Sequence, residues 1–230
     1  MRMFKKLFGV RGQMSPPPPR DTPYPKDSPA NAIYGLLFCD DLGPFQPKSL
    51  TGAADWQAVL FGPENPAKVD ALAHDETAES RVRALAFTWL RAHGLETPKG
   101  LVLGFVLEVA LDGGLDVLAA YADGGVRYIN RTGRMTLIEP GASPEAAAHA
   151  RRLMQIAQPV VDQLGPWEQP RRPPPAQPNV RLNFVVSDGL YFGEGPFDFM
   201  QQDSRAGPLI HEASQLLTYI VEKAEEHRGS

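Results

Sequence analysis

The chain has 230 residues, of which 43% are hydrophobic and 22% charged, close to the average for a folded globular protein. That length suits one large domain or two small ones. The formal net charge of -4 argues against nucleic-acid binding through a basic surface. The single cysteine, Cys39, excludes an intramolecular disulfide framework and a multi-cysteine zinc site. No apolar run approaches the roughly 18 residues that span a bilayer, so we do not expect an integral membrane protein.

Residues 1–30 are predicted to form a basic, proline-rich flexible arm. Residues 1–20 carry five basic and no acidic side chains, so the rest of the chain has a net charge of -9. The run of prolines at 16–19 predicts an extended spacer. A frayed chain end is the simplest interpretation. The alternative is a short amphipathic interaction segment that touches an anionic membrane surface or a partner's groove, formed by Phe4, Lys5, Lys6, Leu7 and Phe8.

Several helices are predicted before the first strand. Two apolar blocks within 31–61 favour short helices. Asn65 is a candidate N-cap and Pro66 suits a first helical turn, so a helix is predicted from residue 65. A second helix is expected to start near Asp75 and to end before Gly94.

The segment 101–139 predicts a four-stranded antiparallel meander. Three short glycine-containing turns separate β-rich runs, which is a strong hairpin signal. The predicted strands are 101–111, 115–122, 126–130 and 134–139. If Gly113 and Gly114 form the first turn, Glu108 lies opposite Ala119.

The last third predicts a helix, a hairpin and another helix. Ser143 and Pro144 open a helix over 143–164, in which Pro159 is expected to cause a kink or a break. A second proline-rich linker is predicted over 166–179. Strands follow over 180–186 and from residue 190, and the segment 193–196, with its glycines at 193 and 195, is expected to interrupt the second of these strands. The final helix is expected to begin at Pro208.

These elements predict one α+β domain over 31–230. A hairpin and one helix would bury too little surface to be stable alone, so the C-terminal part is expected to pack on the meander. The resulting antiparallel sheet has about six strands, with helices on at least one face.

Glu108 is the first candidate site residue, because it is the only charge in an eleven-residue apolar strand. A buried carboxylate has a raised pKa and can serve as an acid or base. The alternative is that this face of the strand is partly open to solvent.

The second candidate is the segment 187–198, which has three carboxylates, a tyrosine and three glycines. Glycines allow a ligand to approach the backbone closely. The segment lacks the spacing of a calcium loop or a phosphate-binding loop, and a turn followed by a glycine bulge is the alternative. Its weak catalytic candidates are Asp188, Glu194 and Asp198, and Tyr191 and Glu194 are the candidates for ligand binding.

No metal or cofactor is expected. The five histidines are scattered without a metal-binding spacing, and Cys39 is expected to be a buried structural residue. Arg171 and Arg172, inside the proline-rich linker, are expected to be a solvated charge pair.

The sequence favours a non-catalytic interaction or adaptor protein of bacterial type, tethered through its arm to a protein partner or an anionic membrane surface. A cytoplasmic location is expected, with membrane association through the arm as the alternative. The competing hypothesis is a small-ligand-binding protein or enzyme whose carboxylate site joins Glu108 to the 188–198 loop.

Overall fold

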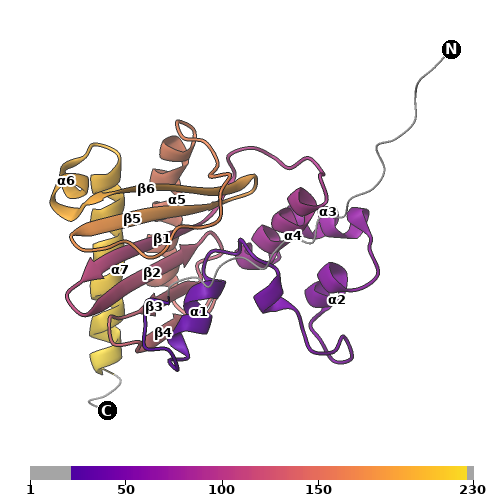
Figure 1. Ribbon diagram of the computed structural model, residues 1–230, viewed down its shortest axis with the longest axis horizontal. Helices are drawn as coiled ribbons and strands as arrows, with labels where there is room; N and C mark the ends of the chain where they lie inside the picture. The colour runs from indigo at the N-terminus through magenta and orange to yellow at the C-terminus, as the bar shows by residue number, and fades with distance from the viewer. Residues whose placement is uncertain (1–21, 227–230) are drawn as a thin grey trace, which may run out of the picture.

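The computed structural model describes residues 22–226, which form one α+β fold around a single antiparallel sheet (Figure 1). The strand order is β4-β3-β2-β1-β5-β6, so the meander and the C-terminal hairpin join along β1 and β5. This confirms the predicted fold class. The strands are β1 Val102–Leu111, β2 Gly114–Tyr121, β3 Val126–Ile129, β4 Met135–Ile138, β5 Asn179–Val186 and β6 Gly189–Pro196.

Seven α-helices and one short 3-10 helix are present in the described part of the chain. They are α1 Ala30–Leu36, the 3-10 helix Gly43–Phe45, α2 Asp55–Phe61, α3 Pro66–His74, α4 Ser80–Ala92, α5 Pro144–Val161, α6 Phe197–Gln202 and α7 Ala206–Glu226. Within residues 22–226, none of them combines the length and hydropathy needed to cross a bilayer.

Two predicted N-caps are confirmed. The Asn65 side chain accepts a hydrogen bond from the Lys68 amide, and the Ser143 hydroxyl oxygen accepts one from the Ala146 amide. Each satisfies a backbone donor that the first helical turn leaves without a partner.

One predicted helix start was wrong, and one of the two effects expected of Pro159, a break, is absent. Asp75 follows the end of α3 instead of starting a helix, and α4 begins at Ser80, whose amide donates to the Asp123 carboxylate at 2.7 Å. Helix α5 runs through Pro159 to Val161 without a break. Pro159 lies in the last turn of the helix. There the loss of its N–H donor affects only the end of the helix.

The sheet has a helical layer on each side, so its two faces bury different cores. We call the side covered by α1 and α4 the α4 face, and the side covered by α5 and α7 the α7 face (Figure 1). Along β1, Val106, Glu108 and Ala110 point to the α4 face. Phe105 and Leu107 point to the α7 face, as the two-residue period of a strand requires.

The first hairpin turn lies one residue earlier in the chain than predicted. Leu111 pairs with Gly114, so the turn consists of Asp112 and Gly113, and Gly113 takes a φ of 77° that favours glycine. Glu108 therefore lies opposite Val117 and not Ala119.

The proline-rich segment 166–179 is packed against the sheet and does not act as a free spacer. Arg171 within it is buried, which contradicts the expected solvated pair. The Trp167 amide donates to the Leu190 carbonyl at 2.7 Å, and the two rings of Trp167 and Phe192 meet edge to face. The segment thus covers part of the β6 edge.

The folded body begins before residue 31. Tyr24, which the sequence placed in the flexible arm, is buried, and its hydroxyl donates to the Leu115 carbonyl at 3.1 Å.

At the other end of the chain, β6 continues through Gly193 and Gly195. A Cβ at Gly195 would lie 3.2 Å from the Met200 sulfur, so the glycine allows α6 to pack closely on the strand.

Two glycines at hairpin turns give a matched stability test. Both Gly113 and Gly124 have positive φ, but only at Gly124 would a Cβ meet another atom, the Ala147 Cβ at 2.7 Å. We expect Gly113→Ala to cost about 1–2 kcal/mol from backbone strain alone. Gly124→Ala should cost about 1–3 kcal/mol more, because it also pushes the turn away from α5. Urea unfolding monitored by circular dichroism measures both, and equal losses would contradict the packing of this turn.

Candidate functional site

Glu108 lies at the centre of a buried polar cluster on the α4 face. Its side chain has no exposed surface. One carboxylate oxygen accepts a 2.5 Å hydrogen bond from the Tyr34 hydroxyl, and the other accepts a 2.8 Å bond from the Asn183 amide. The Arg181 guanidinium is 3.6 Å from the second oxygen. The surface-facing alternative is therefore overturned, because α1 and the proline-rich segment cover this face.

Arg181 connects the two candidate carboxylates. The β1, β5 and β6 register places Glu108, Arg181 and Glu194 in one cross-strand row. Arg181 donates to Glu194 at 2.9 and 2.8 Å through Nε and Nη2. It also donates to the carbonyls of Arg172 and Pro173, at 3.3 and 2.8 Å. One buried guanidinium thus joins three strands to the proline-rich segment.

A second buried arginine, Arg171, lies beside this cluster. The Arg171 guanidinium lies 3.8 Å from the centroid of the Phe38 ring and its Nε is 3.2 Å from the Asp40 carboxylate. The ring stacking and the ion pair offset part of the free-energy cost of removing the arginine charge from water. The cluster balances three carboxylates against three guanidinium groups: Asp40, Glu108 and Glu194, with Arg171, Arg172 and Arg181.

The electrostatics of Glu108 follow from its position. Burial raises its pKa, and the Tyr34 hydrogen bond and the Arg181 charge oppose that shift. Burial together with the neighbouring Glu108 raises the pKa of Tyr34. A surface pocket of about 310 Å³ reaches Tyr34 and Arg171, but Glu108 does not line it. In this position the carboxylate links α1 to β1 and β5 within the core.

The 188–198 residues do not converge on one site. The Asp188 carboxylate accepts from the Tyr191 hydroxyl at 2.9 Å and from the Gly100 amide at 3.1 Å, so it ties the β5–β6 turn to the start of β1. Tyr191 packs on the α7 face, and Asp198 is exposed in the first turn of α6. Only Glu194 joins Glu108.

The remaining sequence candidates have simple outcomes. Cys39 is buried, as expected, and burial raises its pKa to about 12. Among residues 22–226, no group of three or more histidine, cysteine, aspartate or glutamate side chains is arranged to hold a metal ion. The interaction-arm residues Phe4, Lys5, Lys6, Leu7 and Phe8 lie outside the described residues.

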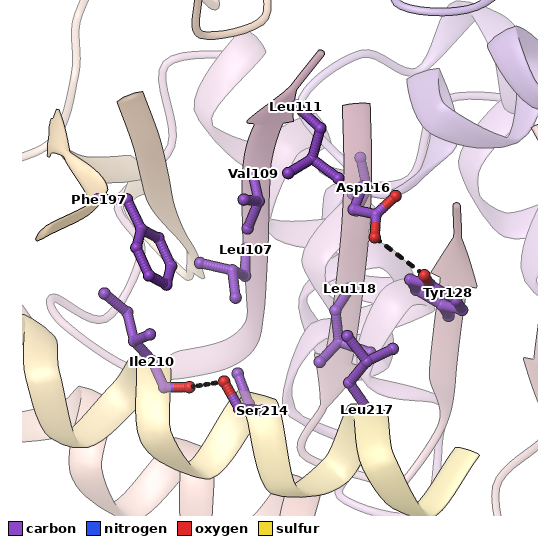
Figure 2. Close-up of a pocket in the computed structure, with 12 residues that line it drawn as sticks. Leu107, Val109, Leu111, Asp116, Leu118, Tyr128, Phe197, Ile210, Ser214 and Leu217 are labelled. Carbon is purple, nitrogen blue, oxygen red and sulfur yellow. Dashed lines mark hydrogen bonds between the residues drawn. The ribbon is translucent and has the colours of Figure 1, made fainter. Parts of the chain in front are cut away.

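A different region is open to solvent. A cleft of about 200 Å³ lies between helix α7 and the strands β1, β2 and β3. Figure 2 shows side chains of β1 and β2 lying above α7, with Leu107 next to Phe197 on one side and Leu118 next to Leu217 on the helix. Its principal apolar lining comes from the sheet, α6 and α7: Leu107, Val109, Leu111, Leu118, Phe197, Ile210 and Leu217. We call this region the α7 cleft.

Polar groups lie at one end of the α7 cleft. The Tyr128 hydroxyl donates to the Asp116 carboxylate at 3.0 Å, as drawn in Figure 2, and the Arg131 amide donates to the same carboxylate at 2.6 Å. Burial and the adjacent Asp116 raise the pKa of Tyr128. Beyond this pair, a shallower pocket continues past Asn130 to the exposed Arg131 and Arg134. An apolar cleft therefore opens onto a basic rim.

Sequence reasoning did not find the α7 cleft. The alternating apolar residues of β1 and the broad apolar stripe of α7 were identified, but both read as core. Whether two apolar surfaces close completely depends on which side chains meet. Here the small Ala213 and Ser214 of α7 leave space opposite Leu107 and Val109. The only sequence signal is this pair of small residues within a stripe of larger ones.

Comparisons with known proteins add no assignment, since no protein-family model matches the chain and no similar protein was found among curated ones.

Removal of the Glu108 carboxylate should destabilise the protein. Glu108→Ala removes the acceptor of the Tyr34 and Asn183 hydrogen bonds and creates a cavity beside Arg181. We expect it to lower the free energy of unfolding by about 3–5 kcal/mol. Glu108→Gln keeps the shape and an acceptor for Tyr34, and should cost about 1–3 kcal/mol. Urea unfolding at pH 7 measures both, and a neutral Glu108→Ala variant would contradict the cluster.

The same pair of proteins gives a pH test. Because burial raises the folded pKa of Glu108 above its ordinary value of 4.5, the folded protein holds this proton more tightly than the unfolded chain. Its contribution to stability is complete below the unfolded pKa and decreases as pH rises through the folded pKa. The stability advantage of wild type over Glu108→Gln should therefore narrow as pH increases above 4.5. Unfolding curves across that range measure it, and a widening difference would contradict the raised pKa.

Proposed function

We propose that this chain is a non-catalytic binding protein that holds an apolar side chain of a protein partner in the α7 cleft. The observation that carries the proposal is the cleft itself, an apolar space open at a polar end. Its volume of about 200 Å³ is below the roughly 300–1,000 Å³ typical of small-molecule pockets. It suits a single large side chain, and protein interfaces commonly place such an anchor in a pocket.

The rim defines the chemistry of the partner. Both oxygens of Asp116 already accept hydrogen bonds within the protein, from the Tyr128 hydroxyl and from the Arg131 backbone amide. The side chains that face solvent beyond it belong to Arg131 and Arg134. Complementary charge steers association and fixes register. The partner segment should therefore carry acidic residues next to a leucine, methionine or phenylalanine anchor.

The buried cluster supports a binding role over an enzymatic one. The competing hypothesis required Glu108 and Glu194 to share a pocket with a ligand. Arg181 does bring them together, but Glu108 is fully covered and its oxygens are engaged by Tyr34 and Asn183. Such a neutralised, hydrogen-bonded carboxylate is well suited to holding a fold in one arrangement.

The N-terminal segment forms the second half of the proposal. Residues 1–20 carry five positive charges, whereas the rest of the chain is net negative. We propose that this segment tethers the protein to an anionic surface, which adds to affinity at the cleft by raising the local concentration of the partner.

A blocking substitution and a matched control test the α7 cleft. Ser214 and Thr218 both lie exposed on α7 and both donate their hydroxyls to the carbonyl four residues earlier, but only Ser214 lines the cleft. Ser214→Phe should fill the opening, whereas Thr218→Phe adds the same ring outside it. We expect Ser214→Phe to weaken partner binding about tenfold or more, and Thr218→Phe to leave it unchanged.

The probes are fluorescein-labelled peptides with one phenylalanine or leucine between aspartate and glutamate residues, measured by fluorescence anisotropy. Control peptides have lysine in place of the acidic residues. Binding that requires the acidic flanks and is lost only in Ser214→Phe supports the proposal. If no acidic-flanked peptide binds better than its lysine control, or if both variants lose binding equally, the cleft is not the docking site.

The tether has its own test, a truncated chain that starts at residue 22. We expect this variant to keep the unfolding free energy of the full chain, because Tyr24 and the whole described body remain. It should lose co-sedimentation with vesicles of phosphatidylglycerol and phosphatidylcholine. Lys5→Glu with Lys6→Glu in the full chain should weaken sedimentation without any deletion. Equal sedimentation of all three proteins would contradict a tether on an anionic membrane.

A further inference from the structure

The strand β4 forms one edge of the sheet. It is last in the strand order and, within residues 22–226, pairs only with β3. The Asn130 amide donates to the Arg134 carbonyl at 2.9 Å, which fixes the alternation of hydrogen-bonded pairs along this hairpin. Counting from that pair, Thr136 and Ile138 turn their backbone groups towards β3. The N–H and C=O groups of Met135 and Leu137 therefore point away from the sheet.

The side chains at this edge are apolar and exposed. Met135 is 37% exposed and Leu137 is 49% exposed, and both lie on the α4 face. Edge strands that stay unpaired are usually protected by lysine, proline, a bulge or a covering segment. The opposite edge has such a cover, since Trp167 bonds to Leu190 on β6. No described residue outside the sheet hydrogen-bonds to Met135 or Leu137.

We propose that β4 pairs with β4 of a second copy of this chain, joining two sheets across a two-fold axis. The outward groups lie at 135 and 137, symmetrically about Thr136, so the strand is complementary to itself. With the axis at Thr136, Met135 of each copy faces Leu137 of the other, and the four outward backbone groups of each copy all find partners. This is an isologous interface, the kind found in two-fold dimers.

Other registers use the edge less completely. Moving the axis to Leu137 pairs Met135 with Glu139, and moving it to Met135 pairs Leu137 with Gly133. Both alternatives separate one apolar side chain from its apolar partner. Apolar cross-strand pairs stabilise a sheet, so the register centred on Thr136 is favoured.

Charge complementarity also favours a second copy. In this register the basic turn that contains Arg131 and Arg134 passes Glu139 of the partner copy. Glu139 already pairs with Arg127 at 2.7 Å, but its side chain remains 62% exposed and can accept another cation. Glu139 of the partner copy lies opposite Gly133 of this turn, so opposite charges come near each other at both ends of the paired strands, whereas a parallel alignment would place the two basic turns together.

A disulfide trap tests the register directly. Thr136 lies at a non-hydrogen-bonded position on the axis, where facing Cα atoms are about 4.5 Å apart. That separation allows a disulfide. Thr136→Cys in the full chain should give a covalent dimer under mild oxidation. Met135→Cys is the control, because the two Met135 positions are diagonal neighbours about 7–8 Å apart. The native Cys39 is buried, so it adds little background.

Mass measurement of the full chain tests the surface without an engineered cysteine. Sedimentation of the wild type should approach twice the chain mass of 25.2 kDa as concentration rises. Leu137→Glu should stay near 25.2 kDa, whereas Val221→Glu, which changes another exposed apolar residue, on α7, should behave as wild type. A wild-type monomer at high micromolar concentration overturns the proposal. A dimer that lacks the Thr136→Cys cross-link also overturns it, because its interface lies elsewhere.

Discussion

The sheet depends on the compensation of one buried carboxylate. Glu108 sits in the central part of β1, with no exposed surface, and an unpaired charge there would cost several kcal/mol. The fold brings it a tyrosine hydroxyl from α1, an amide from β5 and the guanidinium of Arg181. The two hydrogen-bond donors and the arginine charge come from α1 and β5, which are both distant from β1 in the sequence. Glu108 therefore aligns α1 and the C-terminal hairpin on the meander.

Arg181 extends this arrangement to the sheet edge. It holds Glu194 on β6 and two carbonyls of the proline-rich segment, so a stretch that lacks regular structure is anchored by hydrogen bonds to a strand. Such cores are costly to assemble but discriminate strongly between alternative packings. One face of the sheet is thus specified by polar contacts. The other face buries a mainly apolar core, and there α7 leaves the α7 cleft open.

Local sequence signals predicted the elements better than their partners. The glycine-containing turns of 101–139 identified the meander, although the first was placed one residue too late, and Asn65 and Ser143 identified helix starts, because each signal acts within a few residues. Helix α6 was missed since Gly193, Gly195 and Pro196 resemble a break. The burial of Arg171 could not be predicted, because it depends on Phe38 and Asp40, more than 100 residues earlier. Glu108 was identified as unusual from its apolar neighbours, but its covering by α1 is a long-range contact.

The Trp167 amide on Leu190 has a consequence for how the sheet can grow. A strand that approached β6 would have to displace this bond and the adjacent proline-rich backbone, which offers few amide donors of its own. Only one side of the sheet is then available for extension. Fibrous aggregation by strand addition needs two free edges on every subunit, whereas a subunit with one free edge can only terminate a growing stack. Because the proline-rich segment covers the β6 edge, the β4 pairing proposed above would end at a closed pair.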